Sequence, residues 1–303
     1  MKTRYLSMLI VGAVLGLLLF GGLSVSAHDQ IAFTYQKITV EYQTAEVRKA
    51  DGSTSSAEFA SEIILLSDGR ANGGFGIWEG GESDTLSLYR VVGGRISVER
   101  RTGPFFEFKA ERLTPLPANE ITVRFDPSPG NTPTGTVTFF IDGIPASDGS
   151  PQRIIARGSV QSGRVLAEQV DANFDFNYLN APLQTLLVET ISGNYTANFQ
   201  NAALIFPSGH AIGVLALSGP DGAPRSLRIV GGEIQTPHAG AIAALLKSTN
   251  PQTPAARPLP VLLVIADMQD SEPCRIYDIL GTQFPPAHFE ADAYNSHLTI
   301  GSR

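Results

Sequence analysis

The sequence predicts an all-β protein of two related tandem units, each a β-sandwich or a β-barrel, with one short helix in the second unit. The segment Arg90–Ile96 (RVVGGRI) recurs as Arg228–Ile234 (RIVGGEI), and Ala57–Ile77 aligns without gaps on Ala197–Leu217. A repeat at a long, nearly fixed period indicates a duplicated structural unit. Frequent turns are also indicated, because 30 Gly and 20 Pro accompany only 17% charged residues.

The offset between the two copies drifts steadily along the chain. It is 143 residues at Phe33/Phe176, 140 in the ungapped stretch and 138 at Arg90/Arg228. Small insertions and deletions in loops produce such a drift. We therefore expect a first domain over 28–148, a second over 149–281, and a C-terminal tail or last strand over 282–303. Gly143–Pro151, rich in Gly, Pro, Ser and Asp, is the predicted linker.

The N-terminus predicts export. Lys2 and Arg4 precede the 18-residue apolar run Leu6–Leu23, and Val25-Ser26-Ala27 supplies the small residues that a signal peptidase reads. We expect residues 1–27 to be a signal peptide and the mature protein, secreted or periplasmic, to begin at His28. An uncleaved anchor is the alternative, since 18 apolar residues can span a bilayer.

The net charge and the cysteine content exclude several classes of partner and any disulfide within the chain. The chain carries a net charge of −7, and losing Lys2 and Arg4 would make the mature protein more acidic. An acidic surface disfavours nucleic acid and anionic membranes, and we expect no membrane insertion after cleavage. The single Cys274 excludes an intramolecular disulfide and is expected to be a buried apolar residue.

The local elements follow from short apolar runs and turn residues. The runs 62–66 and 202–206 end in Ser67-Asp68-Gly69 and Pro207-Ser208-Gly209, which predict hairpin turns with glycine at positive φ. The Gly93-Gly94 and Gly231-Gly232 pairs predict a second hairpin in each copy, with Gly94 and Gly232 at positive φ. Further strands are predicted at Glu120–Phe125, Thr136–Ile141, Pro260–Ala266 and Cys274–Leu280, and the helix at Ala239–Lys247.

Acidic loops are candidate calcium sites, because calcium takes hard oxygen ligands. Glu79, Glu82 and Asp84 lie within six residues of each other, and Asp267–Glu272 forms a similar loop. The alternative in both places is a solvated acidic turn. Trp78, beside the first loop, would either fill the core or stack on a sugar ring from the surface.

His28 is a candidate copper ligand if cleavage occurs after Ala27. A terminal amine and its imidazole can clasp one Cu(II) ion, and a second histidine would complete a tetragonal site. In this single residue the chain resembles secreted β-sandwich copper chaperones and lytic polysaccharide monooxygenases. The candidate partners are His210, His238, His288 and His297. The alternative is an incidental histidine after the cleavage site.

The C-terminal pattern His288-x-Glu290-x-Asp292 also consists of residue types that can bind a metal ion. Residues two apart on a strand share a face, so these three would lie together. A solvent-exposed strand face gives the same pattern. No local catalytic or nucleotide motif occurs in the chain.

The sequence thus favours a non-enzymatic binding or structural protein, with a protein, a glycan or a small apolar molecule as ligand. Its two copies do not share one polar constellation, which disfavours a duplicated active site. We expect no transition metal and no organic cofactor. The alternative is an extracytoplasmic enzyme or a copper-binding protein that uses His28.

Overall fold

The computed structural model describes residues 32–79, 85–99, 103–115, 118–128, 135–146, 148–190, 193–218, 222, 224–238, 241–249, 259–267, 274–281, 284–292 and 297–300. It is nearly all β, as the sequence predicts. Within these ranges no helix is long and apolar enough to cross a membrane.

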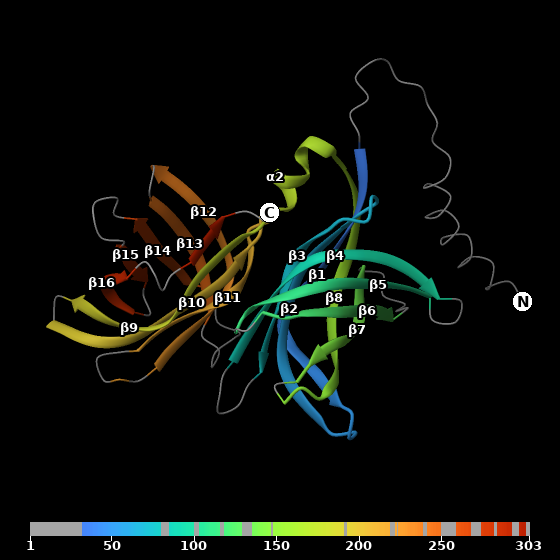
Figure 1. Cartoon of the computed structure of the whole chain (residues 1–303), viewed down its shortest axis with the longest axis horizontal. Coiled ribbons are helices and arrows are strands. Elements are labelled where there is room, and N and C mark those ends of the chain that lie inside the picture. The colour runs from blue at the N-terminus through green and yellow to red at the C-terminus, as the bar shows by residue number, and fades with distance from the viewer. Residues whose placement is uncertain are drawn as a thin grey trace, which may run out of the picture. The chain divides into compact units, whose positions relative to one another are not determined.

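Strands β1 to β8 form a closed antiparallel barrel in which each strand pairs with the next along the chain (Figure 1). Short polar turns and alternating apolar residues favour this up-and-down arrangement. The strands are β1 (Ala32–Lys49), β2 (Thr54–Leu66), β3 (Ala71–Glu79), β4 (Thr85–Glu99), β5 (Gly103–Thr114), β6 (Glu120–Ser128), β7 (Thr136–Pro145) and β8 (Pro151–Leu166).

Side chains fill the barrel interior. Phe59, Phe75, Phe108, Phe125 and Phe139 are each no more than 1% exposed and belong to one apolar cluster. Phe125 lies at the centre, with ring centroids 5.2 Å from Phe108, 5.7 Å from Phe139 and 6.1 Å from Phe59. These contacts make the interior a packed core. Burial of each ring stabilises the fold by about 1.5–3 kcal/mol.

The remaining strands form a second sheet in the order β10-β11-β12-β13-β14-β15-β16-β9-β17. Strand β9 pairs with β10 as well as with β16. The bounds are β9 (Asn177–Thr190), β10 (Gly193–Ile205), β11 (His210–Ser218), β12 (Pro224–His238), β13 (Ala241–Thr249), β14 (Leu259–Asp267), β15 (Cys274–Gly281), β16 (Phe284–Asp292) and β17 (His297–Ile300).

The helix predicted at Ala239–Lys247 is wrong. Residues 241–249 form β13, which pairs along its length with β12 and β14. Its alanines and leucines favour a helix in isolation, but two neighbouring strands override that weak preference. The short helices lie earlier, as a 3-10 turn at Ala167–Gln169 and α2 at Val170–Phe174, between β8 and β9 (Figure 1).

The first pair of predicted hairpin turns is confirmed. Gly69 has φ +90° and Gly209 has φ +82°. In the first turn the N–H of Gly69 donates to the carbonyl of Leu66 at 3.0 Å, and in the second Gly209 donates to Phe206 at 2.9 Å. Glycine is required at both because other residues are strained at this φ.

The second pair of predicted turns is wrong. Gly93-Gly94 lies inside β4 and Gly231-Gly232 inside β12, and neither Gly94 nor Gly232 has a positive φ. A side chain at Gly94 would meet Leu65 and Phe108, each 2.8 Å from the added Cβ. Packing of the core, together with a bulge between Val91 and Gly93, is therefore the reason for glycine here.

The predicted linker Gly143–Pro151 connects two strands of the same barrel. Its residues end β7, form the turn before β8 and begin β8, and β8 is the last strand of the barrel. The barrel therefore extends to Leu166, and the boundary predicted after Asp148 falls at the β7–β8 turn. Polar and glycine-rich composition is shared by linkers and hairpin turns, so it could not separate the two.

Candidate functional site

Five alternating charges form one row across the outside of the barrel. Strand register pairs Arg95 on β4 with Glu107 on β5, and Glu107 with Arg124 on β6. It continues from Arg124 to Asp142 on β7 and from Asp142 to Arg153 on β8. Directly opposed residues of neighbouring strands share a face and interact. We call these five residues the charged row.

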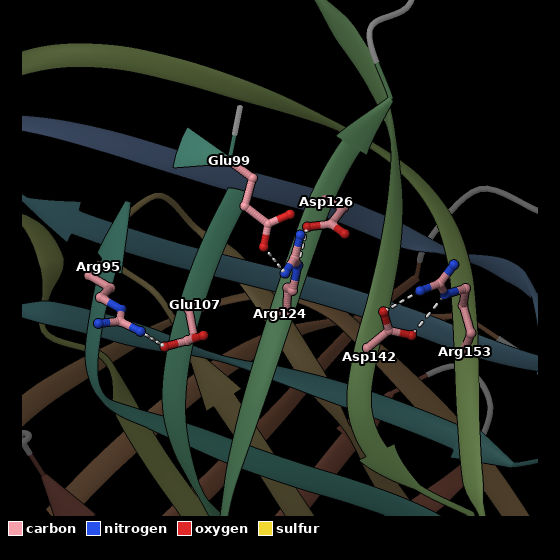
Figure 2. A network of polar contacts seen from close by, with 7 residues as sticks. All are labelled: Arg95, Glu99, Glu107, Arg124, Asp126, Asp142 and Arg153. Atoms are coloured by element: carbon pink, nitrogen blue, oxygen red, sulfur yellow. Dashed lines mark hydrogen bonds and ion pairs between the residues drawn. The ribbon is translucent and has the colours of Figure 1, made fainter. Parts of the chain in front are cut away.

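The charged row contains two ion pairs between its own members, and Arg124 binds two carboxylates beside the row (Figure 2). Arg95 Nη2 lies 2.6 Å from Glu107 Oε1, and Arg153 donates to both carboxylate oxygens of Asp142, at 2.8 and 2.5 Å. Arg124 donates to Asp126 at 2.6 Å and to Glu99 at 2.8 Å. These hydrogen bonds hold the pKa of Arg124 above its usual range. The carboxylates are thus already used by arginines, which leaves the row no free acid or base.

A second polar group lies between β1, β2 and the turn before β11, and we call it the Glu62 cluster. Ser208 Oγ donates to Glu62 Oε2 at 2.8 Å, and Lys37 Nζ lies 3.0 Å from Glu62 Oε1. His210 Nδ1 lies 3.6 Å from Glu62 Oε2, an ion-pair distance when the imidazole is protonated. The Glu62 side chain is only 6% exposed.

The Glu62 cluster contains the residue types of a hydrolytic triad in a different arrangement. The serine hydroxyl donates directly to the carboxylate, and it also accepts the backbone N–H of His210 at 3.2 Å. In a serine hydrolase the histidine takes the hydroxyl proton and the carboxylate orients the histidine. Here the serine is held by the carboxylate itself, which suits a structural link between β2 and the turn that leads into β11.

The Glu62 cluster is expected to make stability depend on pH. Burial raises the pKa of Glu62, but His210, Lys37 and Ser208 together lower it below its usual range. A carboxyl with a lowered pKa stabilises the fold above its unfolded pKa, and that stabilisation is lost as pH falls through the folded pKa. We expect Glu62→Gln to cost about 1–3 kcal/mol at pH 7 and less at pH 3, as measured by urea unfolding at both pH values.

A matched control for this prediction is Glu120→Gln. Glu120 pairs with Lys109 at 3.1 Å in a surface ion pair, with both side chains more than half exposed. Exposed pairs contribute only about 0–1 kcal/mol, so this variant should differ little from the wild type at either pH. A cost of Glu62→Gln that is equally large at pH 3 would contradict the assigned role of its charge.

The third group surrounds Arg228 on β12, and we call it the Arg228 cluster. The Arg228 side chain is 5% exposed and forms an ion pair with Glu58 on β2. Its guanidinium carbon lies 4.4 Å from the centroid of the Tyr42 ring and 5.6 Å from that of the Trp78 ring. Burial raises the pKa of Tyr42 to about 12, although the charge of Arg228 acts to lower it. Burial also lowers the pKa of Arg228.

Apolar side chains pack beside these polar groups. Ala60, Leu88 and Trp78 from the outside of the barrel form one cluster with Leu204 and Ile212 from β10 and β11. Gly74 and Gly76 on β3 leave the space for these two side chains, because an added Cβ would meet Leu204 or Ile212. The Arg228 and Glu62 clusters therefore link strands that are already packed together.

The structure describes some of the predicted site residues, and others lie outside the described ranges. Glu79 ends β3, half-buried, with the amide of Gln152 3.5 Å from its Oε1. His28, Glu82 and Asp84 lie outside the described residues, as does most of the Asp267–Glu272 loop. Trp78 is 4% exposed and fills the core, so the surface sugar-stacking interpretation is wrong. No group of three metal-ligating residues occurs among the side chains that the structure describes.

Sequence reasoning missed Glu58 and Glu62, and it did not connect Ser208, His210 or Arg228 with them. Arg228 opens a repeated segment and aligns with Arg90, so the repeat singled out the position without giving it a role. Arg90 pairs with Glu111 at 2.6 Å, and 29% of its side chain is exposed. Only the three-dimensional contacts distinguish the buried Arg228 from the partly exposed Arg90.

Comparisons with known proteins add little to this geometry. No protein-family model and no curated protein matches the chain. Among solved structures, a protein from Nitrosomonas europaea described as a "putative AttH" is similar, with 10% sequence identity and a TM-score of 0.20. The similarity covers 91% of this chain and 99% of that one.

Proposed function

We propose that this chain is an extracytoplasmic, non-enzymatic binding or structural protein that meets a protein or glycan partner through its outer surface. The observation that carries the proposal is the filled interior of the first barrel, where five phenylalanine rings occupy the centre. A barrel that binds an apolar molecule inside needs an empty interior. The outer face of the barrel, in contrast, carries the charged row, which a partner can contact.

We also propose that the two halves of the chain arose by duplication and that β9 to β16 form a second barrel. The paired glycine turns at Gly69 and Gly209 support this, because they share the same hydrogen-bond pattern. Gly73 and Gly213 support it as well, since a Cβ at either would collide with a carbonyl of the preceding strand. Two like units would give two like binding surfaces and hence avidity.

A turnover assay tests the non-enzymatic proposal. The exported, mature protein is incubated with chromogenic esters, phosphoesters and glycosides, alongside Ser208→Ala. We expect neither protein to exceed the buffer rate, because Ser208 donates to Glu62, whose lowered pKa makes this carboxylate a weak base. Turnover by the wild type that Ser208→Ala abolishes would establish an enzyme instead.

Processing gives a second test, which concerns location. We expect the exported protein to have the mass of residues 28–303, with His28 at its N-terminus, because the Val-Ser-Ala segment fits a cleavage site. Intact-mass spectrometry of protein exported through its own signal measures this directly. A mass that retains residues 1–27 would indicate an anchored protein and would remove the terminal amine that copper requires.

A further inference from the structure

The second half of β4 combines exposed apolar side chains with an open strand edge. Among the side chains that the structure describes, the exposed large apolar residues are Val92, Ile96 and Val98, and all three lie on β4. The pairing of β4 with β3 ends at Arg90, whereas its pairing with β5 continues to Glu99. Beyond Arg90, therefore, no described strand pairs with β4 on its β3 side. An open edge of this kind is a template for pairing with another chain.

The two faces of this half-strand differ in character. On the outer face, Arg95 belongs to the charged row, and Glu99 binds Arg124 of that row (Figure 2). On the other face, Ile96 pairs in register with Phe106, a member of the barrel core. Ile96 and Val98 continue this inward-facing side of β4, yet they are 48% and 65% exposed. The open edge is thus charged on one face and apolar on the other.

The segment is complementary to itself in the antiparallel direction. A second copy of β4, related by a two-fold axis through Ser97, places Arg95 opposite Glu99 and Ile96 opposite Val98. Each of these pairs occurs twice, because the same patch is used on both copies. Opposite charges and apolar residues that face each other directly across antiparallel strands attract. An axis through Arg95 would instead place two arginines opposite each other, so the charges select the register.

The existing contacts of the two charged residues leave room for a second copy. The Arg95 side chain is 68% exposed, and its contact with Glu107 uses one of the five N–H donors of a guanidinium. The Glu99 side chain is 45% exposed and accepts from Arg124 at 2.8 Å. A carboxylate accepts several hydrogen bonds at once. Both residues can therefore bind the second copy while they keep their partners within the chain.

The aligned segment of β12 does not carry this pattern. At the offset of 138 residues that aligns Arg90 with Arg228, Glu233 occupies the position of Arg95, and Pro237 that of Glu99. Proline lacks the backbone N–H that a new strand would need, and it commonly protects strand edges. The self-complementary sequence is therefore particular to β4.

We propose that this protein forms a two-fold symmetric dimer in which Arg95–Glu99 of β4 pairs antiparallel with the same segment of a second copy. The partner is a second copy because the charges and the apolar residues of the segment match only when it meets itself in reverse. This surface is separate from the function proposed above, whose partner is another molecule. The contact is short, which places it among weak interfaces, so we expect dimers at micromolar protein concentrations.

Sedimentation velocity of the purified protein over a range of micromolar concentrations tests the proposal. We expect the wild type to pass from monomer to dimer. Arg95→Glu and Glu99→Arg should each dimerise at least tenfold more weakly, because each places like charges opposite each other twice. An equimolar mixture of the two variants should recover the wild-type affinity, since opposite charges then face each other at both pairs. A wild type that stays monomeric, or folded variants whose mixture does not associate, would overturn the proposal.

Two further variants locate the contact. Arg153→Glu changes the arginine at the other end of the charged row and should dimerise like the wild type. Val98→Lys places a charge opposite Ile96 and should stay monomeric, while its urea midpoint changes little because Val98 is exposed. It also provides an independent test should a charge variant fail to fold. A dimer that Val98→Lys retains, or that Arg153→Glu abolishes, would place the interface elsewhere and overturn the proposal.

Discussion

Replacing Gly73 with alanine should lower the free energy of unfolding by about 2–5 kcal/mol. Gly73 lies in β3 with φ +117°, and an added Cβ would collide with the backbone carbonyl of Glu62 on β2. The cost combines strain at positive φ with overpacking against a backbone atom that cannot rotate away. Urea unfolding of Gly73→Ala against the wild type measures it.

Gly69→Ala is the matched control. Gly69 also has a positive φ, +90°, but nothing lies within 4 Å of the added Cβ. Its substitution therefore carries only the conformational cost, about 1 kcal/mol. Equal losses in the two variants would mean that φ alone matters and that β2 and β3 do not approach as closely as the structure shows.

Arg228→Met should be the most damaging side-chain substitution among the polar clusters. Removing one partner of a buried ion pair leaves the other charge without compensation and costs about 3–5 kcal/mol. Since 22% of the Glu58 side chain is exposed, we expect the lower end of that range. The loss of contact with Tyr42 and Trp78 acts in the same direction.

Two comparisons test this assignment. Arg90→Met removes the repeat-equivalent arginine, whose ion pair with Glu111 is partly exposed, and should cost about 1 kcal/mol or less. The double variant Arg228→Met with Glu58→Gln should be more stable than Arg228→Met alone, because no charge is then left unpaired. Similar costs for the two single variants would show that Arg228 is solvated in solution.

The candidate polar clusters could be predicted only in part. The turn that contains Ser208 was identified, because Pro-Ser-Gly after an apolar run is a local signal. The partner of that serine was not, since Glu62 lies on a strand far away in sequence and carries no motif. Likewise the five members of the charged row are ordinary surface residues along the chain. Their alternation emerges only when five strands are placed in register.

Local sequence accounts for the β-rich class, for the turns at Gly69 and Gly209, and for the strands predicted over 120–125, 136–141, 260–266 and 274–280, because each depends on residues within a few positions of one another. Tertiary structure decided three further points. It made Ala241–Thr249 a strand, because pairing with β12 and β14 outweighs helix propensity. It explained Gly94 by contact with Leu65 and Phe108 instead of by a turn. It buried Arg228 and left Arg90 partly exposed, because burial depends on which strands pack over a residue and a single chain segment carries no record of that.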